Sequence, residues 1–449
     1  MNSIFVSLKR INYRLFFAIL IVMFIPTIYQ TVRIHFLGNM PSDWGINIAS
    51  QLSWINLLYE IIQEALILPL FYILGKSLNN AEELENKIKS GLLITGIIYS
   101  VLSVIIFIFA NQFVIAMAQN KELLQQTVVY IRLETIAGIF STITRFLMLV
   151  FIILGKAKYM YILLILQMVL SIIFDTFLIS DLDISLNIGV NGIAISNIFV
   201  NISLICLGII LLRKINVNIF NGKKMSFSWV KEWYKVGKFS GLESFVRNLV
   251  FMIMIIRMVN IISEQGSYWV ANNFIWGWLL LPALALSDLM KKEVAEDKEN
   301  IKNNTLGYFI LSTIFVVLWL VSIPLWKPFL RYIMNVTGYE TVFFIVIVQT
   351  IFYIVFIYNN ICDSAFYGTG RTDYMLIQSL IVNIGYYGIA FILYVNGVFI
   401  PTLLSISLLF GLGLVMDFIP TVILYFVMLK KLNIKIKDIL RVNNRCNST

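Results

Sequence analysis

The sequence predicts an all-α, polytopic membrane protein with twelve transmembrane helices arranged as two pseudo-symmetric six-helix lobes. Of its 449 residues, 59% are hydrophobic and 13% are charged, and the mean hydropathy is +0.87. A soluble globular domain carries roughly 25% charged residues. Apolar runs long enough to cross ~30 Å of hydrocarbon as helices recur along the whole chain, and one half of the pattern resembles the other.

The apolar runs are taken in chain order, and they predict spans at 15–37, 46–75, 91–112, 125–153, 159–180, 190–212, 239–262, 269–290, 305–326, 342–367, 374–395 and 402–429. The first run follows a basic start, but it is long and no small-residue cleavage site follows it, so we interpret it as a span rather than a signal peptide. The second run contains Pro69, so we expect that helix to bend or tilt.

A repeated hexamer supports the division into two lobes. G-K-A-K-Y-M begins at Gly155 and G-R-T-D-Y-M begins at Gly370, an offset of 370 − 155 = 215 that also places Phe151 on Phe366. A two-fold repeat among hydrophobic segments is a known construction of secondary transporters. We therefore predict an N-terminal lobe at 1–213, a cytoplasmic, amphipathic inter-lobe loop at 214–238, and a C-terminal lobe with a basic tail at 239–449.

The basic residues predict the orientation in the membrane. With twelve spans, the side that holds both termini collects 26 of the 34 Lys and Arg residues, whereas the opposite side has Lys121, Lys327 and Arg331. Positively charged loops stay cytoplasmic, so we expect a multi-pass protein of the cell membrane with both termini inside. The net charge of +10 is then a topology signal, and no nucleic-acid partner is expected.

Charged residues within the spans are the candidates for function. The basic ones are all arginines: Arg33, Arg132, Arg145, Arg247 and Arg257. The acids are Glu60, Glu64, Glu134, Asp175, Glu243, Asp288, Asp363 and Asp417. Each charge costs roughly 2.5–3.5 kcal/mol at the bilayer centre, so these side chains should pair with one another or face water. The acids are candidates for proton or sodium coupling, and the arginines are fixed positive charges.

Spacing narrows the choice among the acids. Glu60 and Glu64 are four residues apart, so they share one helix face, and two like charges there favour a site that holds a proton or cation. The alternative is that both neutralise arginines of neighbouring spans. Glu243 and Arg247 have the same spacing, for which an ion pair within the helix is the favoured interpretation. Asp417 lies deep in the last predicted span.

Amides and aromatic residues suggest a substrate cavity. Asn272, Asn273 and Trp276 lie in the outer half of span 8, and Tyr358, Asn359 and Asn360 lie in span 10. A cavity lined by such groups would suit an amphipathic organic cation or a sugar. Helix packing is the alternative role for each of them.

Several short motifs resemble the multidrug and toxic compound extrusion (MATE) transporters. S-I-I-F-D-T-F-L-I ends at Ile179, and G-V-N-G-I-A-I-S follows from Gly189 to Ser196, which looks like that family's fifth-to-sixth-span signature. The turns I-L-G-K-S-L-N-N-A-E-E, F-I-I-L-G-K-A-K and F-Y-G-T-G-R-T-D also resemble its cytoplasmic loops. The resemblance covers both predicted lobes and implies the family's twelve-helix architecture, within a superfamily that also contains lipid flippases.

The resemblance assigns roles to a few residues and reveals a departure. Asp175 stands where prokaryotic MATE proteins place a cation-site aspartate, and Ser196 stands near a hydroxyl residue of that site. The family's span 1 aspartate falls on Arg33, which cannot bind sodium or shuttle a proton and should pair with Asp175. The usual N-lobe site would then be disabled, and Glu60 or Glu64, or Glu243, Asp363 or Asp417 of the other lobe, could replace it.

Two functions follow from these expectations. The first is an ion-coupled antiporter that exports amphipathic, organic-cation or drug-like molecules. The second is a flippase for a lipid-linked oligosaccharide or other anionic lipid, favoured if Arg33, Arg132 and Arg257 face the cavity. An enzyme is not expected, because no H-E-x-x-H, nucleophile turn or phosphate-binding loop is present. We expect no cofactor beyond H⁺ or Na⁺, a small-molecule or lipid substrate, contact with membrane lipids, and a functional monomer.

Overall fold

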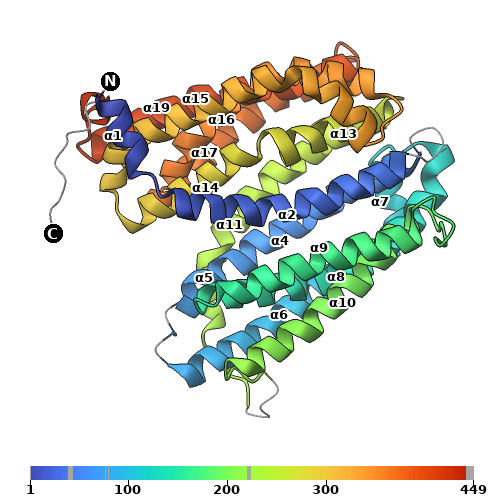
Figure 1. The fold of residues 1–449 in the computed structure, drawn as a ribbon, viewed down its shortest axis with the longest axis horizontal. Helices are drawn as coiled ribbons and strands as arrows, with labels where there is room; N and C mark the ends of the chain where they lie inside the picture. Colours follow the sequence, from blue (N-terminus) through green and yellow to red (C-terminus); the bar gives the residue numbers. More distant parts are fainter. Residues whose placement is uncertain (1, 39–43, 76, 79, 220–223, 441–449) are drawn as a thin grey trace. The chain divides into compact units, whose positions relative to one another are not determined.

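The computed structural model describes residues 2–38, 44–75, 77–78, 80–219 and 224–440 (Figure 1). Every regular element within these ranges is helical. The chain divides into two compact units: unit 1 comprises Met1–Thr27, Ser267–Ile333 and Gly338–Thr449, and unit 2 comprises Ile28–Gly266 and Met334–Thr337. The predicted all-α fold is confirmed for the described part of the chain.

Each of the twelve predicted spans corresponds to a helix or to consecutive helical segments. Among the described residues, ten helices are long and apolar enough to cross a membrane, and a bent pair, Gln265–Leu279 and Leu281–Glu296 with 54° between its halves, makes eleven if it is counted as one span. A further helical run, Leu52–Gly75, covers most of the second predicted span, 46–75, and the first residues of that span lie in the short helix Trp44–Ala49. A π-helical turn, Gln63–Ile67, precedes Pro69 in this run. The bend expected from Pro69 stays a prediction. The protein is therefore a multi-pass membrane protein.

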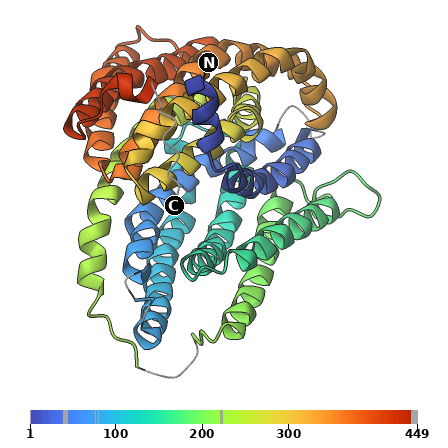
Figure 2. The ribbon, with the colours of Figure 1, turned by 60° about the vertical axis from the view of Figure 1, so that its left-hand side comes forward.

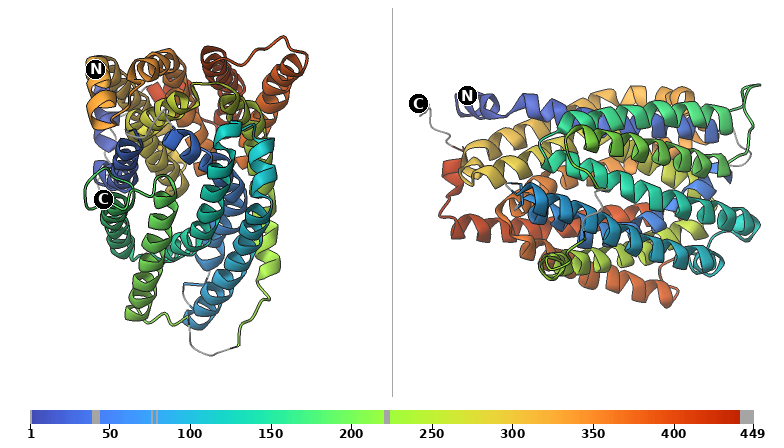
Figure 3. Two further views of the ribbon diagram at one scale, coloured as in Figure 1. Left: turned by 90° about the vertical axis from the view of Figure 1, so that its right-hand side faces the viewer. Right: turned by 90° about the horizontal axis from the view of Figure 1, so that it is seen from below.

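Unit 2 contains the helices of the first half of the chain and the helix that follows them. Its elements are the second part of α2 (Tyr13–Gly38), α3 (Trp44–Ala49), α4 (Leu52–Ile62), η2 (Gln63–Ile67), α5 (Leu68–Gly75), α6 (Ala81–Ile108), α7 (Ala110–Ala116), η3 (Lys121–Leu123), α8 (Leu124–Ile153), α9 (Ala157–Leu178), α10 (Asn191–Lys214), α11 (Val230–Phe251), η4 (Met252–Ile256) and α12 (Arg257–Ile261). Helix α8 packs between α6 and α10, and α9 packs against α10 (Figures 1, 2 and 3).

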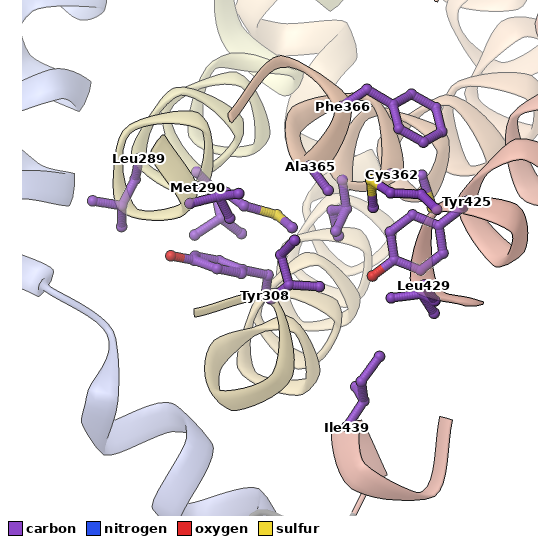
Figure 4. Close-up of a cluster of buried hydrophobic side chains, with 14 of the residues drawn as sticks. Leu289, Met290, Tyr308, Cys362, Ala365, Phe366, Tyr425, Leu429 and Ile439 are labelled. Atoms are coloured by element: carbon purple, nitrogen blue, oxygen red, sulfur yellow. The ribbon is translucent and has the colours of Figure 1, made fainter. Parts of the chain in front are cut away.

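Unit 1 contains most of the remaining helices. Its elements are α1 (Asn2–Arg10), the first part of α2, most of α13 (Gln265–Phe274), η5 (Ile275–Leu279), α14 (Leu281–Glu296), α15 (Glu299–Pro328), η6 (Phe329–Ile333), α16 (Tyr339–Thr369), α17 (Thr372–Leu380), η7 (Ile381–Tyr387), α18 (Gly388–Val395), α19 (Leu403–Lys431) and α20 (Ile436–Leu440). Helix α16 packs against α14, α15 and α19. Their buried side chains, with Phe366 and Tyr425 among the largest, form the core of unit 1 (Figure 4).

The first helix of the predicted second lobe begins before the predicted boundary at 239. Helix α11, expected to open the second lobe, begins at Val230 and belongs to unit 2. Its first turns thus lie within the predicted inter-lobe loop. Residues 220–223 of that loop and 441–449 of the basic tail lie outside the described residues. The lobe boundaries at 213 and 239 stay a prediction.

The repeated hexamer forms the same turn in both units. Gly155 follows α8 and Gly370 follows α16, with φ angles of +68° and +74° that only glycine adopts without strain. In each turn the next residue donates its backbone N–H to a phenylalanine carbonyl five residues earlier, Lys156 to Phe151 and Arg371 to Phe366, both at 2.8 Å. These hydrogen bonds satisfy carbonyls at the helix end. The repeat is therefore structural, and each copy joins the fourth and fifth spans of its half.

Candidate ion and substrate sites

A buried ion pair links α2 to α9 in unit 2. Arg33 donates Nε to Asp175 Oδ2 at 2.9 Å and Nη2 to Asp175 Oδ1 at 3.2 Å. Arg33 Nη2 also donates to Asn197 Oδ1 at 3.1 Å, and the Asn197 amide donates to Glu134 at 2.9 Å. The Asp175 side chain is 1% exposed and that of Arg33 is 14% exposed. The predicted pairing of Arg33 with Asp175 is confirmed.

This network lines a small polar cavity inside unit 2. The cavity has a volume of about 170 Å³ and is bordered by Arg33, Glu134, Asn197 and a second arginine, Arg145. The other polar groups around it come from Tyr29, Gln30, Asn56, Tyr59, Ser141, Thr142, Gln167 and Asn201. Arg145 donates Nη1 to Gln63 Oε1 at 2.8 Å rather than to a carboxylate. Ser196, which directly precedes Asn197 in the sequence, is fully buried. Its hydroxyl has no hydrogen-bond partner among the described residues.

Arg247 of α11 gathers three carboxylates in unit 2. Its Nη1 donates to Glu243 Oε1 at 3.1 Å, and its Nη2 donates to Glu60 Oε1 at 3.1 Å and to Glu64 Oε1 at 2.8 Å. The close approach of α11 to η2 permits this, because a Cβ on Gly241 would lie 2.7 Å from that of a neighbouring alanine. The structure therefore contains both ion pairs considered from the sequence. One is the pair between Glu243 and Arg247 within α11, and the other joins Glu60 and Glu64 to an arginine of another span.

A different arrangement surrounds Asp363 and Asp417, the two candidate coupling acids of unit 1. Asn359 and Asp363 lie four residues apart on α16 and so share a face. The Asn359 amide nitrogen donates to Asp417 Oδ2 of α19 at 2.7 Å and approaches Asp363 Oδ2 at 3.5 Å. Gln378 of α17 donates to Asp363 Oδ1 at 2.9 Å and accepts from Thr421 at 3.0 Å. We call Asn359, Asp363, Gln378, Asp417 and Thr421 the Asp363–Asp417 cluster.

The two carboxylates of the cluster are not neutralised by a described basic side chain. No described lysine or arginine forms an ion pair with Asp363 or Asp417, and Lys291, whose charge acts on Asp363, forms its own ion pair with Asp288 at 2.9 Å. The Asn359 Oδ1 atom is buried and accepts no hydrogen bond from a described residue. Two carboxylates and an amide oxygen are ligands that a proton or a hard cation such as Na⁺ prefers. Among all described residues, no group of three His, Cys, Asp or Glu side chains is placed as a metal site.

The other arginines proposed for a cavity make backbone contacts. Arg132 donates Nε to the Phe107 carbonyl at 3.2 Å, and Arg257 donates Nε to the Ala116 carbonyl at 3.0 Å. Neither lines the polar cavity of unit 2. Carbonyls at the ends of α6 and α7 have no partner within their own helices, which gives these arginines a structural role at the helix ends.

The amide and aromatic candidates of unit 1 are spread over several contacts. Trp276 donates its indole N–H to the Tyr353 hydroxyl at 2.8 Å, and Asn273 donates to the Trp269 carbonyl at 2.9 Å. Tyr358 is within 3.0 Å of the Thr313 hydroxyl. Asn272 and Asn360 are half-buried, and Asn359 belongs to the Asp363–Asp417 cluster. Their substrate role stays a prediction.

Sequence reasoning assigned no site to four polar residues that the structure places in these sites: Asn197, Arg145, Gln378 and Thr421. Arg145 was counted among the intramembrane arginines, but nothing in its spacing separated it from Arg132. Gln378 and Thr421 are single polar residues within apolar runs, and Thr421 follows Asp417 by four residues. That i,i+4 relation was a usable signal.

Comparisons with known proteins agree on the fold. Neither a protein-family model nor a curated protein sequence matches the chain. Among solved structures, a MATE transporter from Vibrio cholerae, VcmN, aligns with a TM-score of 0.68 at 13% identity, covering 96% of this chain and 99% of that one. The fold is that of the MATE transporters.

Two other solved structures have a similar fold. A MOP-superfamily transporter from Pyrococcus furiosus, described as having a binding pocket of reversed polarity, aligns with a TM-score of 0.69 at 13% identity over 97% of this chain and 99% of that one. The lipid II flippase MurJ aligns with a TM-score of 0.66 at 13% identity over 95% and 90%. The likeness at these identities concerns architecture, and function has to be argued from the side chains.

Proposed function

We propose that the chain is an ion-coupled antiporter that exports amphipathic, organic-cation or drug-like molecules by alternating access. The Asp363–Asp417 cluster carries this proposal. The MATE-like fold supports it, because proteins with this fold include a multidrug-resistance MATE transporter. The proposed orientation in the cell membrane, with both termini in the cytoplasm, follows from the distribution of basic residues. A functional monomer is part of the same proposal.

Charge explains why the cluster would couple to an ion. Two carboxylates held in an apolar unit need a compensating cation, because leaving both charged and unpaired costs several kcal/mol. A proton or Na⁺ that enters from the outer side would supply that charge and bridge α16 to α19. Its release would leave two like charges near one another. The ion would thereby change the relative stability of two conformations, which is what coupling requires.

The acids of unit 2 fit this role less well. Asp175 already has its counter-charge in Arg33, and both of its oxygens accept from that guanidinium. Glu60, Glu64 and Glu243 share the guanidinium of Arg247. Arginine keeps its proton at every physiological pH. Each of these acids would therefore accept from a guanidinium that stays charged, although Arg247 alone does not neutralise three carboxylates. Asp363 and Asp417 have no ion-pair partner among the described residues, so we assign the coupling role to them.

One observation favours the second candidate function, a flippase for an anionic lipid. Arg33 and Arg145 both border the polar cavity of unit 2, and no carboxylate among the described residues accepts from Arg145. A phosphate or carboxylate headgroup could use that guanidinium. The antiporter is preferred because the cavity also contains Glu134 and Asp175 is adjacent, so the two arginine charges are balanced.

The proposal is tested by transport in proteoliposomes that contain the purified chain. Ethidium is the probe, and its efflux is measured under an imposed proton gradient, an imposed sodium gradient, and no gradient. The antiporter predicts efflux that one gradient accelerates and that collapses when an ionophore dissipates it. Efflux that is the same under all three conditions, together with gradient-independent transfer of a fluorescent anionic phospholipid between leaflets, would favour the flippase instead.

A further inference from the structure

An apolar cavity lies at the C-terminal end of unit 1, and none of the five residues of the Asp363–Asp417 cluster borders it. It has a volume of about 450 Å³ and an apolar surface, and it is bordered by α15, α16, α19 and the short helix α20. Figure 4 shows Cys362, Tyr425 and Leu429 of α16 and α19 on one side and Ile439 of α20 on the other. A volume of ~300–1,000 Å³ is typical of a small-ligand site.

A second cavity of about 480 Å³ adjoins the first. The two share Phe426, Leu429 and Ile436, so they form one continuous depression. The second cavity is also bordered by Lys430 and Lys435. The depression is therefore apolar at one end and positively charged at the other.

The turn between α19 and α20 places both lysines at the same cavity. Asn433 has φ +58°, a left-handed conformation that reverses the chain after α19. Asn433 itself borders the second cavity. Because the chain turns there, Lys430 before it and Lys435 after it contribute charge to one place.

Neither lysine is neutralised by a described acid. No ion pair of Lys430 or Lys435 exists among the described residues. Asp438, the nearest acid in the sequence, accepts from the backbone N–H of Lys435 at 3.1 Å and borders neither cavity. Lys431 instead lies over the Tyr374 ring at 5.5 Å. The two ammonium groups are thus available to an external anion.

We propose that this depression binds one anionic phospholipid of the surrounding membrane. An acyl chain occupies the apolar cavity between α15, α19 and α20, and the phosphate lies against Lys430 and Lys435. The predicted cytoplasmic position of this end of α19 agrees with such a ligand, because the cytoplasmic leaflet carries the anionic lipids and basic pockets between transmembrane helices bind their headgroups. The site is independent of the proposed transport function.

The proposal is tested by mass spectrometry of the intact, full-length protein released from detergent. The probes are dioleoyl phosphatidylglycerol and dioleoyl phosphatidylcholine, which have the same acyl chains and different headgroup charge. The wild-type protein should retain the anionic lipid about 30-fold more strongly, as expected for two lysines near a phosphate. The variant K430Q/K435Q should retain both lipids equally. Val422, which borders the apolar cavity, is changed to Trp to fill it, and this should weaken retention of both lipids.

A matched control removes two lysines elsewhere. K292Q/K298Q lowers the net charge by the same amount at exposed positions of unit 1 and should keep the full preference. Equal retention of the two lipids by the wild type, or an unchanged preference in K430Q/K435Q, would overturn the headgroup assignment. Unchanged retention by Val422→Trp would overturn the acyl-chain assignment.

Discussion

Breaking the Arg33–Asp175 pair should destabilise the protein strongly, and removing both charges should restore much of the loss. Asp175 is 1% exposed on its side chain and accepts two hydrogen bonds from Arg33, at 2.9 and 3.2 Å. Arg33→Ala leaves that carboxylate buried without a cation, at a cost of roughly 3–5 kcal/mol. In R33A/D175N the remaining amide is neutral, so the double variant should be about 2–3 kcal/mol more stable than the sum of the single changes.

The assay is denaturant unfolding in detergent micelles, followed by tryptophan fluorescence, for the four proteins of the double-mutant cycle. Arg132→Ala is the matched control, because that guanidinium is half-exposed and donates to a backbone carbonyl at 3.2 Å. It should cost less than about 1 kcal/mol. Additive single effects, with a coupling energy near zero, would refute the view that the two residues form a closed ion pair.

Three further changes test other parts of the structure. Arg247→Ala should lower the free energy of unfolding by roughly 2–3 kcal/mol, less than a fully buried pair because its side chain is 34% exposed; a cost below 1 kcal/mol would contradict a shared counter-charge for three carboxylates. Gly155→Ala and Gly370→Ala should each cost about 1–2 kcal/mol through their positive φ, although no atom lies within 4 Å of the added Cβ. Gly96→Ala, equally open but without a positive φ, should be neutral or stabilising in the same unfolding experiment, and equal effects at all three glycines would be inconsistent with the repeated turn. Arg145→Ala should leave ethidium efflux within twofold of wild type, whereas the flippase alternative predicts loss of anionic-lipid transfer.

The sequence was sufficient for the fold because membrane helices impose simple rules. Every backbone polar group must be satisfied within a span, so long apolar runs have to be helices. All twelve predicted runs are helical, and the turns after Gly155 and Gly370 repeat as expected. The observed helix limits differ from the predicted span limits where a side chain caps the helix. Helix α6 begins at Ala81, ten residues before the predicted span at 91–112, because the Asn80 side chain accepts from the Glu83 N–H.

Side-chain partners were predictable only where spacing or resemblance linked them. Glu243 and Arg247 are four residues apart on one helix, and the alignment of Arg33 with an expected acid pointed to Asp175. The bridging by Asn359 between two aspartates was not predictable, because helical periodicity gives the face of a residue but not the helix that this face meets. The contact of Gln378 with Asp363 could not be predicted for the same reason.

In the proposed mechanism, Asp363 and Asp417 couple transport to an ion, whereas Asp175 is held in a permanent ion pair. The direct measurement is gradient-driven ethidium efflux from proteoliposomes containing D363N, D417N or R33A/D175N, with D183N in an exposed loop as control. If the ion binds at the Asp363–Asp417 cluster, D363N and D417N each abolish the acceleration by the ion gradient, while R33A/D175N and D183N keep it. Retained acceleration in both D363N and D417N, with its loss in R33A/D175N, would show that the ion acts at Asp175 instead.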